Sequence, residues 1–287
     1  MILIDQLTYA RKSFTLNVHH LQLNSGITIL VGKNGAGKST FLQLLATALK
    51  PHRGTISYGR KTVSEALPYI RKQIGFLPTG VELYEEMKTK QFLNYMSELK
   101  GISNTKAVEA SIQAMNLADV KKNKIKSLSQ GMKQRVGIAQ ALLDSPSFLL
   151  LDEPLNYLDS QERKNVVSLL SRYGTNKIVL VATHDLNEWE EIADNIIWLS
   201  EGQVLFDGTV NCWKSNAIRV WQGKVKHTEV HGLDTNRITY MKRVEDGIIV
   251  KYLSESKPFK SFTLVSTSIE DAYFIRKYNA LLEHNQF

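Results

Sequence analysis

Short apolar runs dominate the first quarter of the chain and predict strands there. Strand candidates lie at residues 1–9, 13–23 and 26–32, and a hairpin-type segment lies at 54–63. Runs of this length that are rich in isoleucine, leucine, valine and threonine, and that end in glycine or asparagine, are typical of β-structure. The pattern therefore favours a β-rich stretch up to about residue 75.

The hydrophobic period changes from about residue 80 to about residue 145. An apolar stripe recurs there at positions i, i+3, i+4 and i+7, formed by Phe92, Tyr95, Met96 and Leu99. This spacing places the four side chains on one face of a helix. Two more helices are predicted at 107–120 and 131–143, so this stretch should form a helical subdomain.

Two continuous apolar runs follow, at residues 147–154 and 177–184. Such runs have the length of strands that are buried on both faces of a parallel sheet. Strands, then a helical insert, then strands alternating with helices indicate an α/β core that carries an α-helical subdomain. We assign residues 1–210 to this domain.

The character of the chain shifts again after about residue 210. Alternating segments occur at 217–225, 237–244 and 247–253, and Asp246-Gly247 supplies a hairpin turn between the last two. A final helix is expected over 266–284. Its N-cap would be Ser268, with Asp271 three residues further on. Residues 211–287 are therefore predicted to form a small α+β appendage.

Composition narrows the class of protein. Hydrophobic residues make up 43% of the 287 residues and charged residues 22%, which is ordinary for a globular chain. The single cysteine, Cys212, excludes an internal disulfide and fits a reducing cytosol. We find neither a signal-peptide pattern nor an apolar run of roughly 20 residues. The net charge of +8 is spread along the chain, so we expect no nucleic-acid partner.

The segment ILVGKNGAGKSTFLQLL at 29–45 runs an apolar strand into a glycine-rich turn and then into an apolar helix. It fits the phosphate-loop pattern G-x-x-x-x-G-K-[ST]. Backbone N–H groups of such a loop surround phosphates, and the helix dipole adds positive potential. A glycine-rich turn without a ligand is the alternative interpretation. The nucleotide-binding residues predicted here are Gly32, Asn34, Gly35, Gly37, Lys38, Ser39 and Thr40.

Each polar side chain of this loop has a predicted role. Lys38 would reach the β- and γ-phosphates of a nucleoside triphosphate, and Ser39 would offer its hydroxyl to Mg²⁺. Thr40 would lie near the α-phosphate. We therefore expect ATP and Mg²⁺ as cofactors.

Acidic and imidazole side chains follow the two buried strands. Asp152 and Glu153 end the first, and His184 ends the second. Ligands of doubly wound sheets bind at such strand ends. Asp152 would hold Mg²⁺, Glu153 would act as a general base on water, and His184 would contact the γ-phosphate. A solvated loop start for the carboxylates and a structural role for the histidine are the alternatives.

The stretch SLSQGMKQRVGIAQALLDSPSFLLLDEPLNYLD strongly resembles the ATP-binding cassette (ABC) family. GKNGAGKST resembles its Walker A motif, FLLLDEP its Walker B motif, and LSQGM at 128–132 its signature LSGGQ. NYLD, ending at Asp159, resembles the D-loop, and His184 the switch histidine. The motif set covers residues 1 to about 210. The resemblance implies a phosphate-loop parallel-sheet core, an antiparallel β subdomain and a helical subdomain.

The resemblance also implies further site residues. Tyr9, 23 residues before Gly32, would stack on adenine. Ser129, Gly131 and Asp159 would act on the ATP of a second, partner protomer. Ser129 also suits a simple helix N-cap, and both roles can hold. Two ATP molecules would join the pair, and hydrolysis would release it.

Two departures from the family pattern stand out. The signature has Gln130 in place of glycine and Met132 in place of glutamine, and a methionine cannot donate a hydrogen bond to ribose. The Q-loop position falls on Thr79, whose hydroxyl could ligate Mg²⁺ at shorter reach. Its effect on coupling to the helical subdomain is left open.

Three functional classes of the family were compared. A ribosome-acting member usually has two tandem cassettes, and a DNA-repair ATPase needs a long coiled-coil insert. We therefore favour an ATPase at the cytoplasmic face of the membrane, bound peripherally to a separate polytopic permease. The ending STSIEDAYF resembles exporter subunits, with a drug, lipid or amphipathic peptide as substrate; an importer is the alternative. Homodimer and heterodimer both stay open.

A surface for the membrane partner is expected within residues 80–100. Leu83, Tyr84 and nearby exposed residues would line a groove for a short helix of that partner. The alternative is that all of them belong to the core of the subdomain.

Overall fold

The structure, a computed structural model, describes residues 1–12, 14–80, 82–102 and 104–284. The chain forms two compact units. The N-terminal unit comprises Met1–Asp185 and Glu191–Asp207, and the C-terminal unit comprises Leu186–Glu190 and the residues from Gly208 onward. Among the described residues, no helix combines the length and apolar character that crossing a membrane requires.

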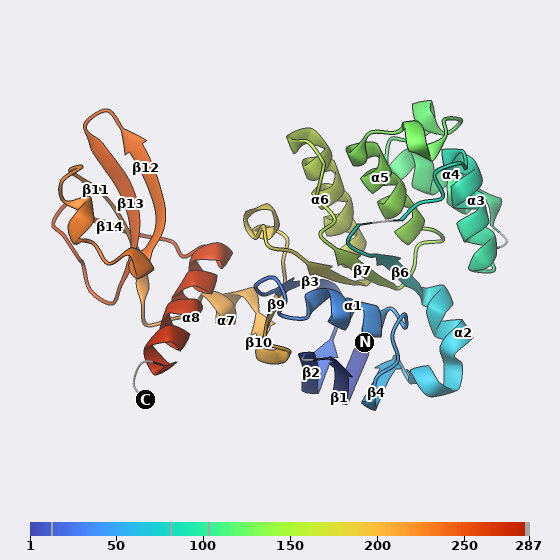
Figure 1. The fold of residues 1–287 in the computed structure, drawn as a ribbon, viewed down its shortest axis with the longest axis horizontal. Coiled ribbons are helices and arrows are strands. Elements are labelled where there is room, and N and C mark those ends of the chain that lie inside the picture. The colour runs from blue at the N-terminus through green and yellow to red at the C-terminus, as the bar shows by residue number, and fades with distance from the viewer. Residues whose placement is uncertain (13, 81, 103, 285–287) are drawn as a thin grey trace. The chain divides into compact units, whose positions relative to one another are not determined.

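One long sheet organises the N-terminal unit (Figure 1). Within the described residues its strands follow the order β5 (Lys61–Thr62), β4 (Arg53–Tyr58), β1 (Ile2–Arg11), β2 (Phe14–Leu23), β10 (Gln203–Thr209), β9 (Asn195–Ser200), β3 (Gly26–Val31), β8 (Ile178–Ala182), β7 (Phe148–Asp152) and β6 (Ile74–Leu77). The segments from β5 to β2 pair antiparallel. Strands β9, β3, β8, β7 and β6 pair parallel. This arrangement matches the predicted parallel core with an antiparallel β subdomain.

The central parallel strands are buried on both faces. Every residue of β3 and β8 is buried. Helix α1 (Lys38–Leu45) packs against β7 and β8, and α6 (Ser160–Gly174) packs against β3 and β8. The continuous apolar runs in the sequence follow from this double cover, which excludes water from each strand.

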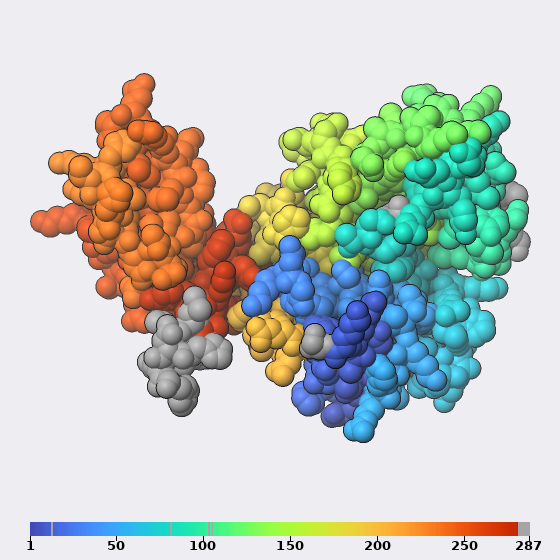
Figure 2. Space-filling model, viewed as in Figure 1, coloured from blue at the N-terminus to red at the C-terminus, as the bar shows by residue number. Residues whose placement is uncertain are grey.

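A group of helices forms the predicted helical subdomain, shown in green and teal in Figure 2. It contains α3 (Thr89–Leu99), α4 (Thr105–Ala114) and α5 (Gln130–Ala141), which pack on one another. Short 3₁₀ turns at Ala118–Val120 and Ile125–Ser127 connect α4 to α5. The described residues between Thr79 and Lys88 contain no helix, so the helical stretch begins later than the periodicity predicted.

Two elements near the β-rich stretch were not predicted. Helix α2 (Val63–Gln73) contains Pro68 and a non-helical residue, Ala66, at φ −136°. Its N-terminus is fixed by a capping box between Thr62 and Glu65. Because Ala66 interrupts the helix, Pro68 lies in the first turn of the second helical piece, where a proline is tolerated. Strand β6 follows directly and pairs with β7.

The C-terminal unit is a second, smaller α+β body. It contains α7 (Val210–Lys214), an antiparallel sheet and α8 (Ile269–His284). The strand order is β12 (Ile238–Val244), β13 (Gly247–Ser254), β11 (Arg219–Val225) and β14 (Thr263–Val265). Figure 1 shows α8, in red, beside the orange strands of its own unit. Val220 and Leu253 cluster with Ile275 of α8.

Of the two sequence signals predicted in this unit, the N-cap is confirmed and the hairpin turn lies one residue earlier than predicted. Val244 pairs with Gly247, so Glu245 and Asp246 form the β12–β13 turn and Gly247 begins β13. At the start of α8 the Asp271 N–H donates to the Ser268 hydroxyl at 3.0 Å, and the Ser268 N–H donates to the Asp271 carboxylate at 3.2 Å.

Candidate active site

The phosphate loop joins the end of β3 to the start of α1. Gly37 has φ +106° and precedes the helix, a conformation that favours glycine. A Cβ at Gly32 would lie 2.3 Å from the Leu199 carbonyl oxygen, so the close approach of β9 also requires a glycine there. The sequence therefore folds into this loop because only glycine fits at these two points.

Lys38 lies in the loop with 7% of its surface exposed. Its ammonium donates to the carbonyl oxygens of Gly32 at 2.6 Å and Lys33 at 3.3 Å. Burial lowers the pKa of Lys38, while the nearby carboxylates of Glu153 and Asp152 oppose this effect. A half-desolvated ammonium that is held by carbonyls is suited to exchange these contacts for phosphate oxygens.

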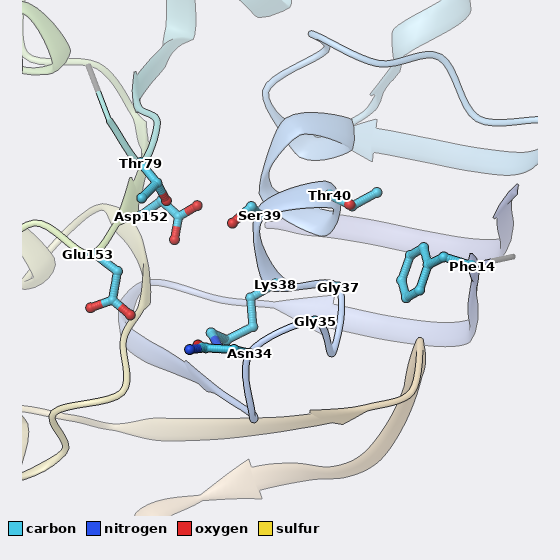
Figure 3. A pocket seen from close by; sticks show the side chains of 10 residues that line it. All are labelled: Phe14, Asn34, Gly35, Gly37, Lys38, Ser39, Thr40, Thr79, Asp152 and Glu153. Atoms are coloured by element: carbon cyan, nitrogen blue, oxygen red, sulfur yellow. The ribbon is translucent and has the colours of Figure 1, made fainter. Parts of the chain in front are cut away.

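A cavity of about 290 Å³ opens over this loop. Figure 3 shows the side chains that line it, which come from the loop, the first hairpin and the ends of β6 and β7. The lining residues are Phe14, Asn34, Gly35, Gly37, Lys38, Ser39, Thr40, Thr79, Asp152 and Glu153. Eight of the predicted loop and strand-end residues are thus brought to one cavity, together with Thr79.

Three oxygen donors face one another at one side of the cavity. Ser39, Thr79 and Asp152 come from α1, the segment after β6 and the end of β7, and Figure 3 shows their side chains close together. Asp152 is buried, with 3% exposure. Hydroxyl and carboxylate oxygens are the ligands that Mg²⁺ prefers, so the donor set fits this ion.

The donor set is incomplete without a phosphate. Among the described residues, no group of three or more His, Cys, Asp or Glu side chains could hold a metal ion. Mg²⁺ in proteins is commonly held by one or two carboxylates together with substrate phosphates. The site thus suits a metal that arrives with a nucleotide.

Glu153 stands next to Asp152 with its backbone at φ +50°, a conformation that is unusual for a residue with a side chain. Its N–H donates to the Ala182 carbonyl at 2.8 Å, which fixes this turn against β8. One carboxylate oxygen lies 2.8 Å from His184 Nδ1, and the other accepts from the Thr183 hydroxyl at 3.3 Å. The carboxylate is thereby oriented at both oxygens, with 14% of the side chain exposed.

The signature and D-loop residues do not line this cavity. Ser129 caps α5 by accepting from the Met132 N–H at 3.2 Å, and Asp159 caps α6 by accepting from the Glu162 N–H at 2.8 Å. The two caps lie close together. Gly131 follows Ser129, Tyr157 precedes Asp159, and a Cβ at Gly131 would lie 2.8 Å from the Tyr157 carbonyl oxygen. Two helix N-termini therefore share one surface away from the chain's own phosphate loop.

The aromatic residue at the cavity differs from the expected one. The Tyr9 ring lies 5.2 Å from the ring of His52, and Tyr9 is absent from the cavity lining. Phe14 lines the cavity instead, and a Cβ at Gly37 would lie 2.5 Å from its ring. Figure 3 places Phe14 on the side of the loop away from Asp152 and Glu153. Phe14 is therefore a second candidate for the aromatic contact, and the role of Tyr9 stays a prediction.

Two further side chains support the site without having been predicted. Gln134 of α5 donates to the carbonyl oxygens of Glu153 at 3.2 Å and Pro154 at 3.1 Å. The hydroxyl of Thr183, which is 4% exposed, reaches Glu153 as described. Gln134 lies four residues after Gln130 and therefore on the same face of the helix as this signature residue. This spacing is the one sequence feature that could have indicated a role for Gln134 at the site.

Comparison with known proteins identifies the family. A family model described as "ABC transporter" matches residues 16–156. The uncharacterised ABC transporter ATP-binding protein YxlF of Bacillus subtilis (strain 168) is 35% identical over 215 residues, which span 72% of this chain and 70% of YxlF. The chain belongs to the ABC transporter family. It is an ABC ATPase.

Other relatives of this ABC ATPase are known by substrate or by structure. The molybdenum import ATP-binding protein ModC of Brucella melitensis biotype 1 is 32% identical, over 64% of this chain and 53% of ModC. The dimeric, post-hydrolysis structure of the ATP-binding cassette MJ0796 bound to ADP and Pi is 25% identical, with a TM-score of 0.65. That alignment covers 73% of this chain and 99% of MJ0796. The fold is therefore that of an ABC cassette.

Proposed function

We propose that this ABC ATPase is the energy-supplying subunit of a transporter whose membrane-spanning protein is a separate chain. ATP binds over the phosphate loop, two cassettes pair around two ATP molecules, and hydrolysis separates them. The observation that carries the proposal is the placement of Glu153. Its carboxylate lines the same cavity as Lys38 and Ser39 and is held by His184 at 2.8 Å.

The residues divide the chemistry among themselves. Glu153 takes the proton from the attacking water, and His184 orients that carboxylate and reaches the γ-phosphate. Lys38 and the loop N–H groups bind the β- and γ-phosphates. Mg²⁺, held by Ser39, Asp152 and Thr79, would neutralise charge on the phosphate oxygens. These assignments follow the loop geometry and the oxygen donors described above.

Pairing of two cassettes gives the signature residues their role. Ser129 and the N-terminus of α5 would face the γ-phosphate bound to the partner protomer, with Gly131 and Asp159 beside them. Their absence from the chain's own cavity supports an action in trans. The partner is a second copy of this chain or a homologous cassette.

A groove in the N-terminal unit is the proposed seat for the membrane protein. It has a volume of about 730 Å³ and runs between α2, β6 and the end of α3. Leu99 at its edge is 62% exposed. Tyr84 is absent from the lining of this groove, is 54% exposed and packs edge-on against Tyr95 at 5.6 Å. The groove is thus the proposed docking surface, and the contact predicted for Leu83 and Tyr84 stays a prediction.

The proposed direction is export of a drug, lipid or amphipathic peptide, with the ATPase bound at the cytoplasmic face of the membrane. The support is the STSIEDAYF ending, which resembles exporter subunits. Import is the second candidate, because the relative ModC is described as a molybdenum import protein. A solute-binding lipoprotein encoded beside this chain would favour import, and a lone polytopic protein would favour export.

Purification from membranes tests the transport assignment. We expect the Glu153→Gln chain, solubilised in detergent with ATP, to co-purify with one polytopic protein and with a second cassette chain. Lys38→Ala is the matched control, because it should lose the ATP-dependent second cassette. Purification of the Glu153→Gln chain with ribosomes would contradict the proposal, and so would a wild-type chain that shows no ATPase activity in complex with the polytopic protein.

A further inference from the structure

Five residues from inside the cassette belong to the C-terminal unit. Leu186–Glu190 clusters with the residues from Gly208 onward, although the residues on either side of it belong to the N-terminal unit. The segment begins two positions after His184. The chain that carries the switch histidine therefore enters the C-terminal unit almost at once.

Glu190 is the main polar anchor of this segment. One of its carboxylate oxygens forms an ion pair with Lys214 at the end of α7. The other accepts from the N–H of Ile269, the first residue of α8, at 2.6 Å. A carboxylate at a helix N-terminus is also favoured by the helix dipole. Both bonds lie within the C-terminal unit.

Two more hydrogen bonds lie at the start of α8. Asn187 donates from its side-chain amide to the Glu270 carboxylate at 3.1 Å. The indole of Trp213 donates to the Ile269 carbonyl at 2.9 Å, so both peptide groups of this first helical residue are held. Trp189 and Trp213 are both fully buried. The segment is thus clamped to the start of α8 and not loosely attached.

The residues that precede the segment in the chain include His184, which contacts Glu153. His184 Nδ1 is 2.8 Å from Glu153, and only Asp185 separates His184 from Leu186. Asp185 is itself bonded, since its carboxylate accepts from Arg163 at 3.1 Å. A shift at Leu186 therefore has only the backbone dihedrals of two residues over which it can be absorbed before it reaches His184.

We infer that Glu190 is a positioning residue for ATP hydrolysis. Its bonds to Lys214 and to the N-terminus of α8 hold the segment after His184 and so set the position of that histidine against Glu153. Loss of these bonds then lowers turnover while leaving ATP binding unchanged, because Glu190 contacts no residue of the phosphate loop. The inference rests on the roles proposed above for Glu153 and His184.

The alternative is that Leu186–Glu190 only completes the core of the C-terminal unit. A purely structural role would lower the melting temperature without a specific effect on kcat. Lys251 offers a matched control, because its ammonium pairs with Asp271 of the same helix at 3.2 Å, and among the described residues it forms no ion pair or hydrogen bond with Leu186–Glu190. Lys251→Ala removes one ion pair of α8 and leaves every bond of Glu190 in place.

The test compares full-length Glu190→Ala, Glu190→Gln and Lys251→Ala for kcat, KM, ATP affinity and melting temperature. We expect Glu190→Ala to lower kcat about tenfold, since small misplacements of a catalytic group cost up to about a hundredfold, with ATP affinity unchanged. Glu190→Gln keeps an acceptor for Ile269 and should recover part of kcat. Lys251→Ala should keep kcat. Equal kcat in Glu190→Ala and wild type, or equal losses in the alanine variants, would overturn the inference.

Two additions separate the possible failures. If Glu190→Ala does not fold, the milder Asn187→Ala serves in its place, with a smaller expected fall in kcat, and an unchanged kcat there counts against the inference. His184→Ala is measured alongside. If it hydrolyses ATP as wild type does, the proposed site and this inference fail together. If it is inactive while the Glu190 variants are normal, only this inference fails.

Discussion

Glu153 shows how single residues in this site combine strain with function. A left-handed backbone at a residue with a side chain typically costs about 1–3 kcal/mol and persists only where surrounding contacts fix it. Here the Ala182 carbonyl, Thr183 and His184 supply those contacts. The strained turn aims the carboxylate into the cavity, beside the buried Asp152 rather than away from it.

Replacing this carboxylate should uncouple binding from turnover. We expect Glu153→Gln to keep ATP binding and to lose about 10²–10⁴-fold in kcat, because a positioned general base is removed. ATP should then accumulate a dimer that gel filtration detects. Normal hydrolysis, or a variant that stays monomeric with ATP, would exclude the role of general base.

Phe14 lines the cavity, so we expect it to contribute more to nucleotide affinity than Tyr9 does. Stacking of a base on an aromatic ring is worth about 1–3 kcal/mol, so Phe14→Ala should weaken ATP binding by roughly tenfold or more. Phe14→Tyr keeps the ring and should bind normally. Fluorescence titration with ATP measures both, and Tyr9→Ala is the control. A larger loss at Tyr9 than at Phe14 would restore the original assignment.

At the scale of elements, the N-termini of α5 and α6 act as one surface. Arg135 of α5 lies 3.1 Å from Glu162 of α6, and this pair is mostly buried. Glu162 also belongs to the capping box of Asp159. The two helices should therefore move together when a partner cassette approaches.

A mixed dimer tests whether this surface acts in trans. Ser129→Arg should block hydrolysis at the partner's site and leave ATP binding to the chain's own loop unchanged. Placing Ser129→Arg in one protomer and Glu153→Gln in the other disables a single site twice, whereas both changes in one protomer disable both sites. We expect one live site in the first arrangement and none in the second. Equal ATPase activity in the two would refute the trans assignment.

Restoring the consensus residue at Met132 should have little effect. A neutral hydrogen bond contributes only about 0.5–1.5 kcal/mol, so Met132→Gln should change kcat and KM less than tenfold. Steady-state ATPase assays of the two chains decide this, and a gain above tenfold would show that the ribose contact limits turnover.

Periodicity predicted those elements whose packing agrees with their local pattern. The buried strands β3, β7 and β8 and the helix α5 were found because double cover or a phosphate-loop context leaves a clear signal. Helix α2 was missed because Pro68 argues against a continuous helix; the structure accommodates the proline by a break at Ala66.

Some residues of the site could be predicted from the sequence and others could not. Loop glycines, Asp152 and Glu153 are adjacent in sequence to recognisable strands, so their convergence could be predicted. Phe14 could not, because its contact with Gly37 depends on how tightly the β1–β2 hairpin turns. The membership of Leu186–Glu190 in the C-terminal unit depends on contacts across more than 70 residues of sequence, which no local pattern records.

At the scale of the whole molecule, the nucleotide machinery and the C-terminal unit are separate bodies that share one short segment. Every residue of the phosphate-loop cavity lies in the N-terminal unit. Binding of ATP should thus be independent of the appendage, whereas turnover should not.

Truncation after Gly208 tests this division. The shortened chain should keep ATP affinity within about twofold, because no residue of the cavity is removed, and should lose kcat. The truncation would expose the Trp189 side chain, which is buried in the full chain. The additional change Trp189→Ser therefore limits aggregation of the shortened chain. Nucleotide titration and circular dichroism are the measurements. Loss of ATP binding in a chain that is still folded would contradict the division.

The shared segment also bears on how such a protein can evolve. An appendage made only of terminal residues could pass between cassettes by one recombination event at its boundary. A cassette that received only the terminal residues would lack Glu190 and Asn187, which bind Lys214 and the start of α8 in this protein. The first backbone N–H group of the transplanted helix would then lose its carboxylate acceptor. The unit has to be inherited together with a stretch from the interior of its cassette, so the two parts are expected to share one phylogeny.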